Sequence, residues 1–200
     1  MPVTAFMTHS NSSWSSRPLL AALVILLAIS ALPLRAESGI GEQAPRFDLA
    51  DAGGERFRFP ERLTGPTIVL FWATWCPYCK ALMPHLQSVV EEYDGAIEVL
   101  ALDFREDGDP RQYLVKMGYD FRLFPAADAV AAAWGVKTTP GLFLVDASGR
   151  VLFSNFSIPP EAYARGPTQA AGELKHYQKA ARKAPVWAAE LRKAIDRARQ

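Results

Sequence analysis

The apolar run Thr67–Ala73 constrains the fold most, because so hydrophobic a segment has to lie inside a folded domain. Its β-branched and aromatic residues and the lack of polar alternation indicate a strand buried on both faces. The apolar positions that follow recur at helical spacing from Cys76 to Tyr93. Pro77 suits a first helical position, where its missing N–H is not needed. The sequence therefore predicts a buried strand that leads into a helix with Cys76 at its start and Cys79 one turn later.

The remaining pattern predicts an α/β fold. Strand–helix–strand units followed by a closing hairpin are typical of a mixed central sheet flanked by helices. The predicted elements are an N-terminal hairpin over Phe47–Phe59 that turns at Gly53-Gly54, a strand at Ile97–Phe104, a helix between Asp109 and Gly118, a helical piece at Ala126–Trp134, and strands at Gly141–Asp146 and Arg150–Asn155.

Residues 156–200 are predicted to form a C-terminal loop and helical extension that packs on a domain of residues 37–155. Thr168 is a candidate cap for a helix that Pro185 ends, and a stripe of Trp187, Leu191 and Ile195 predicts a last, separate helix. The many basic residues after Glu173 indicate either a basic tail for an acidic surface or a solvated helix face, and the solvated face is the simpler interpretation.

Residues 1–36 have the layout of a secretory signal peptide. A positive residue, Arg17, precedes an apolar run from Leu19 to Leu32, and small Ala36 follows at the expected cleavage point. The run is short for a membrane span, which needs about 20 apolar residues. The alternative is an uncleaved N-terminal anchor, which would be the chain's only membrane contact. Both hypotheses predict an exported protein, in the periplasm or another extracytoplasmic compartment.

The charge balance is that of an ordinary globular protein. The chain has 22 Lys and Arg against 21 Asp and Glu, and 50% of its residues are hydrophobic. No strong net charge is available to bind a polyanion, so no nucleic-acid partner is expected.

Cys76 and Cys79 are the only cysteines, and three roles are open for the pair. A structural disulfide is weakly favoured, because closing so short a loop stabilises a protein little. A zinc site would need two more ligands, which His85 and His176 are poorly spaced to supply. Thiol–disulfide exchange fits best. A thiolate at a helix start is stabilised, so Cys76 can attack a disulfide and Cys79 can resolve the product.

Thr139-Pro140 is a second candidate element, directly before the strand at Gly141. Proline can begin a strand but cannot lie inside a central one, and X-Pro bonds are the ones that adopt cis geometry. A cis bond here would turn the Thr139 backbone outward, where an extended substrate could pair with it. The candidate substrate-binding residues are Trp75, Pro77, Tyr78, Thr139 and Pro140.

These segments resemble the TlpA/ResA-like thiol–disulfide oxidoreductases of the thioredoxin superfamily. The matching stretches are Ile40–Leu49, Phe71–Leu86 and Trp134–Val151. The resemblance implies a thioredoxin fold, Cys76 as nucleophile, Cys79 as resolving thiol and Pro140 as a cis-proline. It implies a redox-active Cys76–Cys79 disulfide as the sole redox group, without another cofactor or a metal. Members of this family typically reduce protein disulfides outside the cytoplasm, often during cytochrome c maturation, and an upstream membrane electron donor is expected.

Two positions depart from the family pattern. Leu70 stands where thioredoxins carry a buried aspartate, and Leu82 where TlpA/ResA-like proteins often carry a glutamate. The direction of electron flow is therefore open, and a thiol oxidant of the same fold is an alternative. A copper-binding carrier that uses both thiolates, with or without His85, is a second alternative. A peroxidase is a weaker one, since peroxidases do not need the second cysteine.

Overall fold

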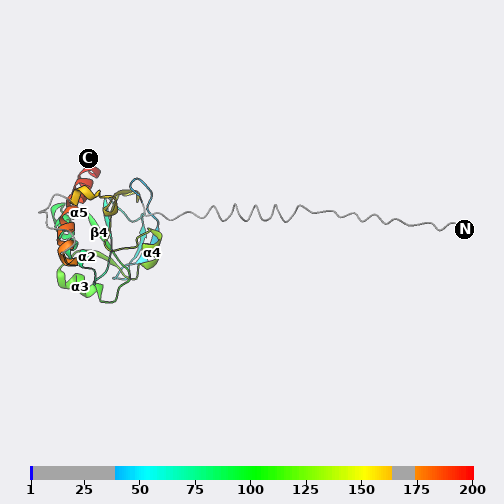
Figure 1. Cartoon of the computed structure of the whole chain (residues 1–200), viewed down its shortest axis with the longest axis horizontal. Coiled ribbons are helices and arrows are strands. Elements are labelled where there is room, and N and C mark those ends of the chain that lie inside the picture. The colour runs from blue at the N-terminus through cyan, green and yellow to red at the C-terminus, as the bar shows by residue number, and fades with distance from the viewer. Residues whose placement is uncertain (2–38, 164–173) are drawn as a thin grey trace. The chain divides into compact units, whose positions relative to one another are not determined.

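A mixed five-stranded sheet forms the centre of the protein in the computed structural model, which describes Met1 and residues 39–163 and 174–200 (Figure 1). The strand order is β5-β4-β3-β6-β7, with β3, β4 and β5 parallel and β6 and β7 antiparallel to their neighbours. The strands are β3 (Thr67–Trp72), β4 (Glu98–Asp103), β5 (Arg122–Phe124), β6 (Gly141–Val145) and β7 (Val151–Ser154). Every residue of β3 is buried, as predicted for a central strand.

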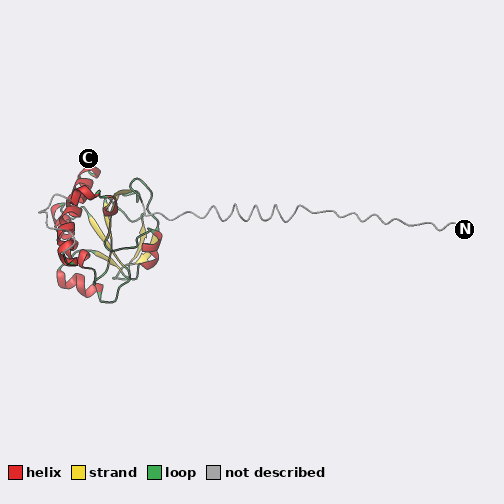
Figure 2. Ribbon diagram, in the orientation of Figure 1, coloured by secondary structure: helices red, strands yellow, loops and turns green. Residues whose placement is uncertain are grey.

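Helices cover both faces of this sheet (Figure 2). They are α2 (Pro77–Glu92), α3 (Pro110–Met117), α4 (Asp128–Ala133) and α5 (His176–Ala198), with short 3₁₀ turns η1 (Asn155–Ser157) and η2 (Pro160–Tyr163). Figure 1 shows α2, α3 and α5 on one side of the sheet and α4 on the other. The hairpin of β1 (Phe47–Ala50) and β2 (Arg56–Phe59) adds its phenylalanines to the α4 side.

The C-terminal helix differs from the prediction. Pro185 does not end a helix, because α5 continues through it from His176 to Ala198. A proline inside a helix costs about 3 kcal/mol through its missing N–H and its ring. Here its ring is exposed, while Ala184 and Trp187 on either side are buried in the core shared with α2. Packing of both halves outweighs the local cost. The expected cap Thr168 lies outside the described residues, as does the leader 1–36.

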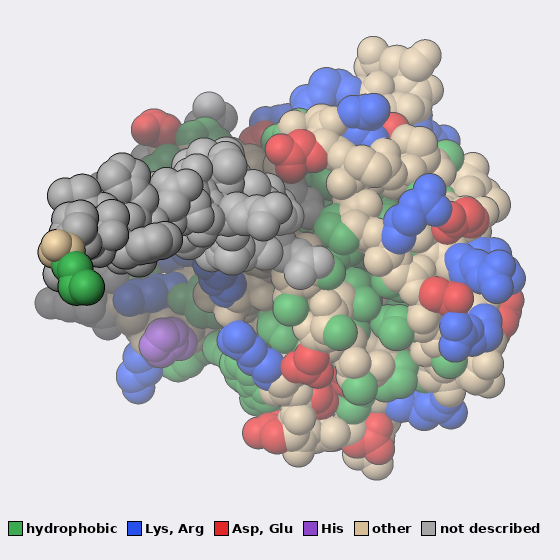
Figure 3. All heavy atoms as spheres, turned by 90° about the vertical axis from the view of Figure 1, so that its right-hand side faces the viewer, with side chains coloured by type: hydrophobic (Ala, Val, Ile, Leu, Met, Phe, Trp, Pro, Cys, Tyr) green, Lys and Arg blue, Asp and Glu red, His purple; other side chains and the backbone are tan. Residues whose placement is uncertain are grey.

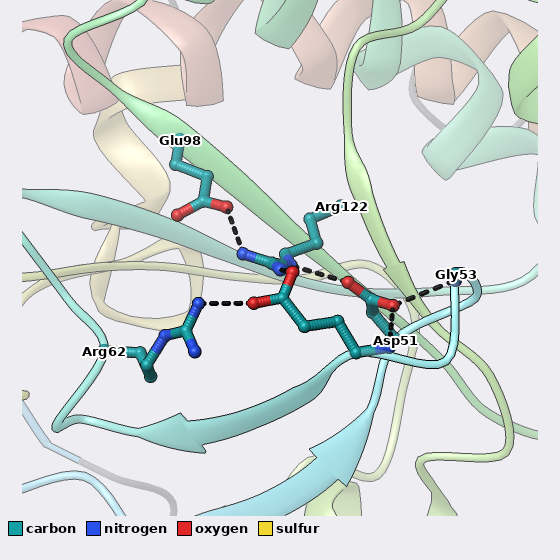
Figure 4. A network of polar contacts seen from close by, with 6 residues as sticks. Asp51, Gly53, Arg62, Glu98 and Arg122 are labelled. Atoms are coloured by element: carbon teal, nitrogen blue, oxygen red, sulfur yellow. Dashed lines mark hydrogen bonds and ion pairs between the residues drawn. The ribbon is translucent and has the colours of Figure 1, made fainter.

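Strand β5 was also missed, since three residues show no readable alternation. Its pairing beside β4 is a tertiary effect. Arg122, at its start, is held by carboxylates from the β1–β2 turn and from the start of β4 (Figure 4). Arg122 Nε contacts Asp51 Oδ2 at 2.9 Å, Nη2 contacts Glu55 Oε2 at 2.6 Å, and Nη1 contacts Glu98 Oε1 at 3.5 Å. This network ties the β1–β2 turn to the sheet edge.

Charged side chains of both signs are interspersed over the face seen in Figure 3. The hairpin itself carries such pairs, for example Asp48 with Arg56 at 2.9 Å. Within residues 39–163 and 174–200, no helix has the length and hydrophobicity needed to cross a membrane.

Candidate functional site: the Cys76–Cys79 dithiol

Cys76 caps the amino end of α2. Its backbone is extended (φ −77°, ψ 112°), Pro77 takes the first helical position, and the Cys79 N–H donates to Cys76 Sγ at 3.1 Å. The sulfur thus occupies the place that a serine or aspartate oxygen has at an ordinary helix start. Strands β3 and β4 end in register at Trp72 and Asp103, which sets Cys76 just beyond the edge of the sheet. Both thiols are free, and Cys76 is 1% exposed and Cys79 0%.

The two thiols have opposite acidities. A hydrogen bond from the Cys79 side chain lowers the pKa of Cys76 to about 6, although burial opposes the shift; Thr139 and the amides of Cys79 and Tyr78 lower it further. Burial raises the pKa of Cys79 well above its usual value, and the neighbouring Cys76 raises it further. At neutral pH the pair therefore holds one thiolate, on Cys76, and one proton, on Cys79.

The apolar surroundings of Cys79 explain part of this difference. Leu70 and Leu82, which replace the carboxylates expected from the family pattern, are both fully buried in the core that contains Cys79. Trp72 is buried in the same core, and its Nε1 has no hydrogen-bond partner among the described residues. No carboxylate at either position can accept the Cys79 proton, so another group or solvent has to do so.

The Thr139–Pro140 bond is cis, as predicted, and it lies beside the dithiol. Asn155, which is buried, fixes this loop from the far side: its Nδ2 donates to the Pro140 carbonyl at 3.0 Å, and its Oδ1 accepts from the Leu142 N–H at 2.9 Å. A Cβ added at Gly141 would come within 2.9 Å of the Val136 side chain, so only glycine fits there. The sequence identified the proline but not Asn155, whose role depends on tertiary contacts.

A second loop holds the residues just before Cys76. Glu106 accepts from the Thr74 N–H at 2.7 Å and from Thr74 Oγ1 at 2.5 Å, and Trp75 Nε1 donates to the Arg105 carbonyl at 2.7 Å. Arg105 has a φ of 54°, a conformation that non-glycine residues rarely adopt and that often accompanies functional sites. A Cβ at Gly108 would meet Thr74 Oγ1 at 2.6 Å. The acidic and glycine residues that follow β4 are the sequence signal for this loop.

Tyr78, between the two cysteines, is half-buried because α5 packs over the start of α2. Its ring lies 6.2 Å from that of Trp187 and 6.4 Å from that of His176. Trp75, in contrast, is 47% exposed, and Pro77 is half-buried.

A groove of about 310 Å³ lies between the cis-proline loop and the C-terminal segments. We call it the α5 groove; its walls include Tyr78, Thr139, Pro140, Tyr163, Lys183 and Trp187. It therefore contains three of the five candidate substrate-binding residues.

His85 lies on the α5 side of α2, where burial and the charge of Arg192 lower its pKa. In residues 39–163 and 174–200, no three His, Cys, Asp or Glu side chains come together as a metal-ligand group, so Cys76, Cys79 and His85 do not form one.

Comparison with known proteins decides the family. Residues 40–154, more than half of the chain, match the AhpC/TSA family. The chain belongs to the AhpC/TSA family. One relative is the thiol-disulfide oxidoreductase ResA of Geobacillus thermodenitrificans. It is 31% identical to this chain over 139 residues, which cover 66% of this chain and 78% of the relative. A thiol:disulfide interchange protein DsbE homolog of Paracoccus denitrificans is 35% identical over 119 residues, covering 56% and 64%.

Solved structures confirm the fold of this AhpC/TSA family member. The thioredoxin domain of a thiol-disulfide oxidoreductase from Bacteroides vulgatus superposes with a TM-score of 0.53 at 16% identity, covering 62% of this chain and 91% of that domain. The predicted thioredoxin fold and the resemblance to ResA-like proteins are therefore both confirmed.

Proposed function

We propose that this protein is an extracytoplasmic thiol–disulfide oxidoreductase that reduces protein disulfides through Cys76 and Cys79. One observation carries the proposal: Cys76 Sγ caps α2 and accepts from Cys79 at 3.1 Å, and its thiol pKa is lowered to about 6. The names of the relatives ResA and DsbE homolog support the same reaction class.

In the proposed reaction the Cys76 thiolate attacks one sulfur of a client disulfide. The client S–S bond breaks, a mixed disulfide forms with Cys76, and the other client sulfur leaves as a thiolate and takes a proton from solvent. Cys79 then loses its proton and attacks Cys76 Sγ, which releases the second client thiol and leaves a Cys76–Cys79 disulfide. Two electrons and two protons pass to the client, so a donor, which we propose to be membrane-bound, has to restore the dithiol.

The remaining candidate residues would hold the client. Thr139 and Pro140 offer backbone for an extended segment, Trp75 gives an exposed apolar surface, and Pro77 and Tyr78 shape the start of α2. Export would depend on the apolar leader within residues 1–36. A client in cytochrome c maturation is the most specific form of the proposal.

The direction of transfer depends on how strongly the thiolate is stabilised. A more stable thiolate makes the disulfide a stronger oxidant, and thiol pKa values are about 7 in thioredoxin and about 3.5 in the oxidant DsbA. The value of about 6 for Cys76 is nearer the reductant. The lowered pKa is also the observation that favours the second candidate, a thiol oxidant.

The deciding measurement is the reduction potential of the Cys76–Cys79 pair, equilibrated in dithiol and glutathione buffers and followed by tryptophan fluorescence. A potential near or below about −250 mV supports the reductase, and one near −120 mV supports the oxidant. The absence of a reversible two-electron transition would contradict both. In that case stoichiometric retention of Cu(I) after a chelator challenge would support the copper carrier instead.

A further inference from the structure

The α5 groove has an aromatic wall that the C-terminal segments build against the start of α2. Trp187 is 5% exposed, and its Nε1 donates to the Tyr163 hydroxyl at 2.8 Å. Tyr78 lies against the Trp187 ring on one side. Rings held by packing and hydrogen bonds lose little entropy when a ligand binds, so this wall is a preformed binding surface.

One cation lies over this wall. Lys183 Nζ is 5.4 Å from the centre of the Tyr163 ring and 5.9 Å from that of Tyr78, within cation–π range of both. Among the described residues, no carboxylate lies within ion-pair distance of Lys183, whereas Arg192 and Lys193, farther along α5, pair with Glu92 and Glu190. Lys183 is thus an ammonium group at the rim of a groove, available to a carboxylate from outside.

The charge of the surrounding helix has the same sign. From residue 174 to residue 189 the sequence carries four cations, Lys175, Lys179, Arg182 and Lys183, and no acidic residue. The acidic residue of η2, Glu161, is exposed and forms no ion pair with them in the described part of the chain. These cations give the first half of α5 a local excess of positive charge, which attracts acidic ligands.

The groove begins next to the reactive sulfur. Thr139 lines it and also contacts the Cys76 thiol, and Pro140 and Tyr78 line it as well. An extended chain advances about 3.3 Å per residue, so a segment whose cysteine reaches Cys76 would place its next one or two side chains in the groove.

We propose that the α5 groove selects clients that carry an aspartate or glutamate within two residues of their disulfide cysteine, with Lys183 binding the carboxylate. This inference rests on the proposed reductase function and adds a substrate class to it. The aromatic wall takes the apolar part of the acidic side chain, and the ammonium group fixes its charge. Lys183 is then a specificity residue for the client.

The test uses short peptides with one cysteine disulfide-bonded to uncharged mercaptoethanol and flanked by Glu, Gln or Lys. Their reduction by the reduced full chain is followed at low salt, and each rate is divided by that for dithiothreitol to remove the peptide's own reactivity. Wild type is expected to favour the Glu peptide over the Gln peptide about fivefold, the effect of a partly exposed ion pair. The preference is expected to shrink in 0.5 M NaCl, where the Debye length falls to roughly 4 Å from about 10 Å at 0.1 M.

Variants locate the preference. Lys183→Gln is expected to abolish it and Lys183→Glu to turn it towards the Lys peptide, while Lys193→Gln, the same change at the far end of α5, is expected to keep it. A wild-type enzyme that reduces all three peptides equally, or a Lys183→Gln variant that still favours Glu, would overturn the inference alone. Failure of wild type to reduce even the Gln peptide, relative to a Cys76→Ser control, would overturn the proposed function and the inference together.

Discussion

The two faces of the central sheet have different cores. The face under α2 and α5 is mainly aliphatic and contains both cysteines, with Leu70, Leu82 and Leu86 among its fully buried side chains. The opposite face, under α4 and the β1–β2 hairpin, is dense in aromatic rings. The centre of the Trp134 ring, for example, lies 5.5 Å from the ring centre of Phe59, 5.3 Å from that of Phe71 and 5.2 Å from that of Phe143.

One face of the sheet therefore holds the cysteines, and the other face holds the sheet in place. Interlocked aromatic rings allow few alternative packings, so the α4 face fixes the sheet edge from which Cys76 projects. The aliphatic face adjoins the sulfur atoms that would change covalent state in the proposed exchange. Changes on the two faces should therefore affect different observables.

The largest expected effect is on the α2 face. Cys76→Ser should reduce exchange with a protein disulfide to the uncatalysed level, because a hydroxyl is not ionised at neutral pH. Cys79→Ser should instead accumulate a mixed disulfide, visible by mass spectrometry. Near pH 6, where the Cys76 thiolate adds little to the stability of the folded state, both variants should unfold at nearly the wild-type urea concentration. A Cys76→Ser protein that retains exchange would contradict the assignment of the nucleophile.

The next effect is on the aromatic face. Trp134→Ala should lower the free energy of unfolding by about 3–5 kcal/mol, since it leaves a large cavity and removes the hydrogen bond from Trp134 Nε1 to the Pro45 carbonyl (3.0 Å). Urea denaturation measures the loss. In the folded fraction the Cys76 pKa should stay near 6, and a large shift would show that the two faces are coupled.

The pH dependence of the reduced protein sharpens the comparison. Alkylation of Cys76 should rise with a midpoint near pH 6, against an ordinary thiol value of 9.0. Because the folded pKa is the lower one, this thiolate stabilises the folded state above pH 9, and the contribution is lost as pH falls from 9 to 6. Three pH units correspond to up to about 4 kcal/mol.

Cys79 should not disturb that window. Its folded pKa is raised, so its effect on stability begins only above the unfolded value, near pH 9. Urea titrations of the reduced protein between pH 6 and 9 should show the slope, and Cys76→Ser should remove it. A slope that persists in this variant would assign it to another group.

The smallest effect concerns the loop before Cys76. Glu106→Gln should destabilise the protein by about 1–3 kcal/mol, because the carboxylate accepts from Thr74, Asp107 and Gly108. It should also loosen the Trp75 side chain. Fluorescence anisotropy can detect this change as long as the signal of the other tryptophans stays constant. Asp107→Asn, at an exposed neighbour, is the matched control and should change neither quantity.

Local patterns predicted the elements whose cause is local. The apolar run of β3, the start of α2 at Pro77, the Asp109 cap and the Gly118 end of α3, and the cis bond before Pro140 are all present. Each depends on residues within one turn or one strand. This is why the position of the dithiol and of its proline neighbour could be predicted.

The missed features depend on contacts between distant segments. Tyr78 is half-buried only because α5 returns over it, and α5 passes Pro185 only because its other face is packed. Asn155 and Glu106 act on residues 15 and 32 positions away. The two partners of each such pair never fall within one helix or one strand.

The burial of Cys76 has a kinetic consequence. A sulfur that is ionised at neutral pH yet 1% exposed meets small oxidants rarely, despite its intrinsic reactivity. The surrounding side chains have to part before any disulfide reaches it, and a bound client can supply the free energy for that opening. Under the proposed function, discrimination between clients would then be exerted through access to the sulfur.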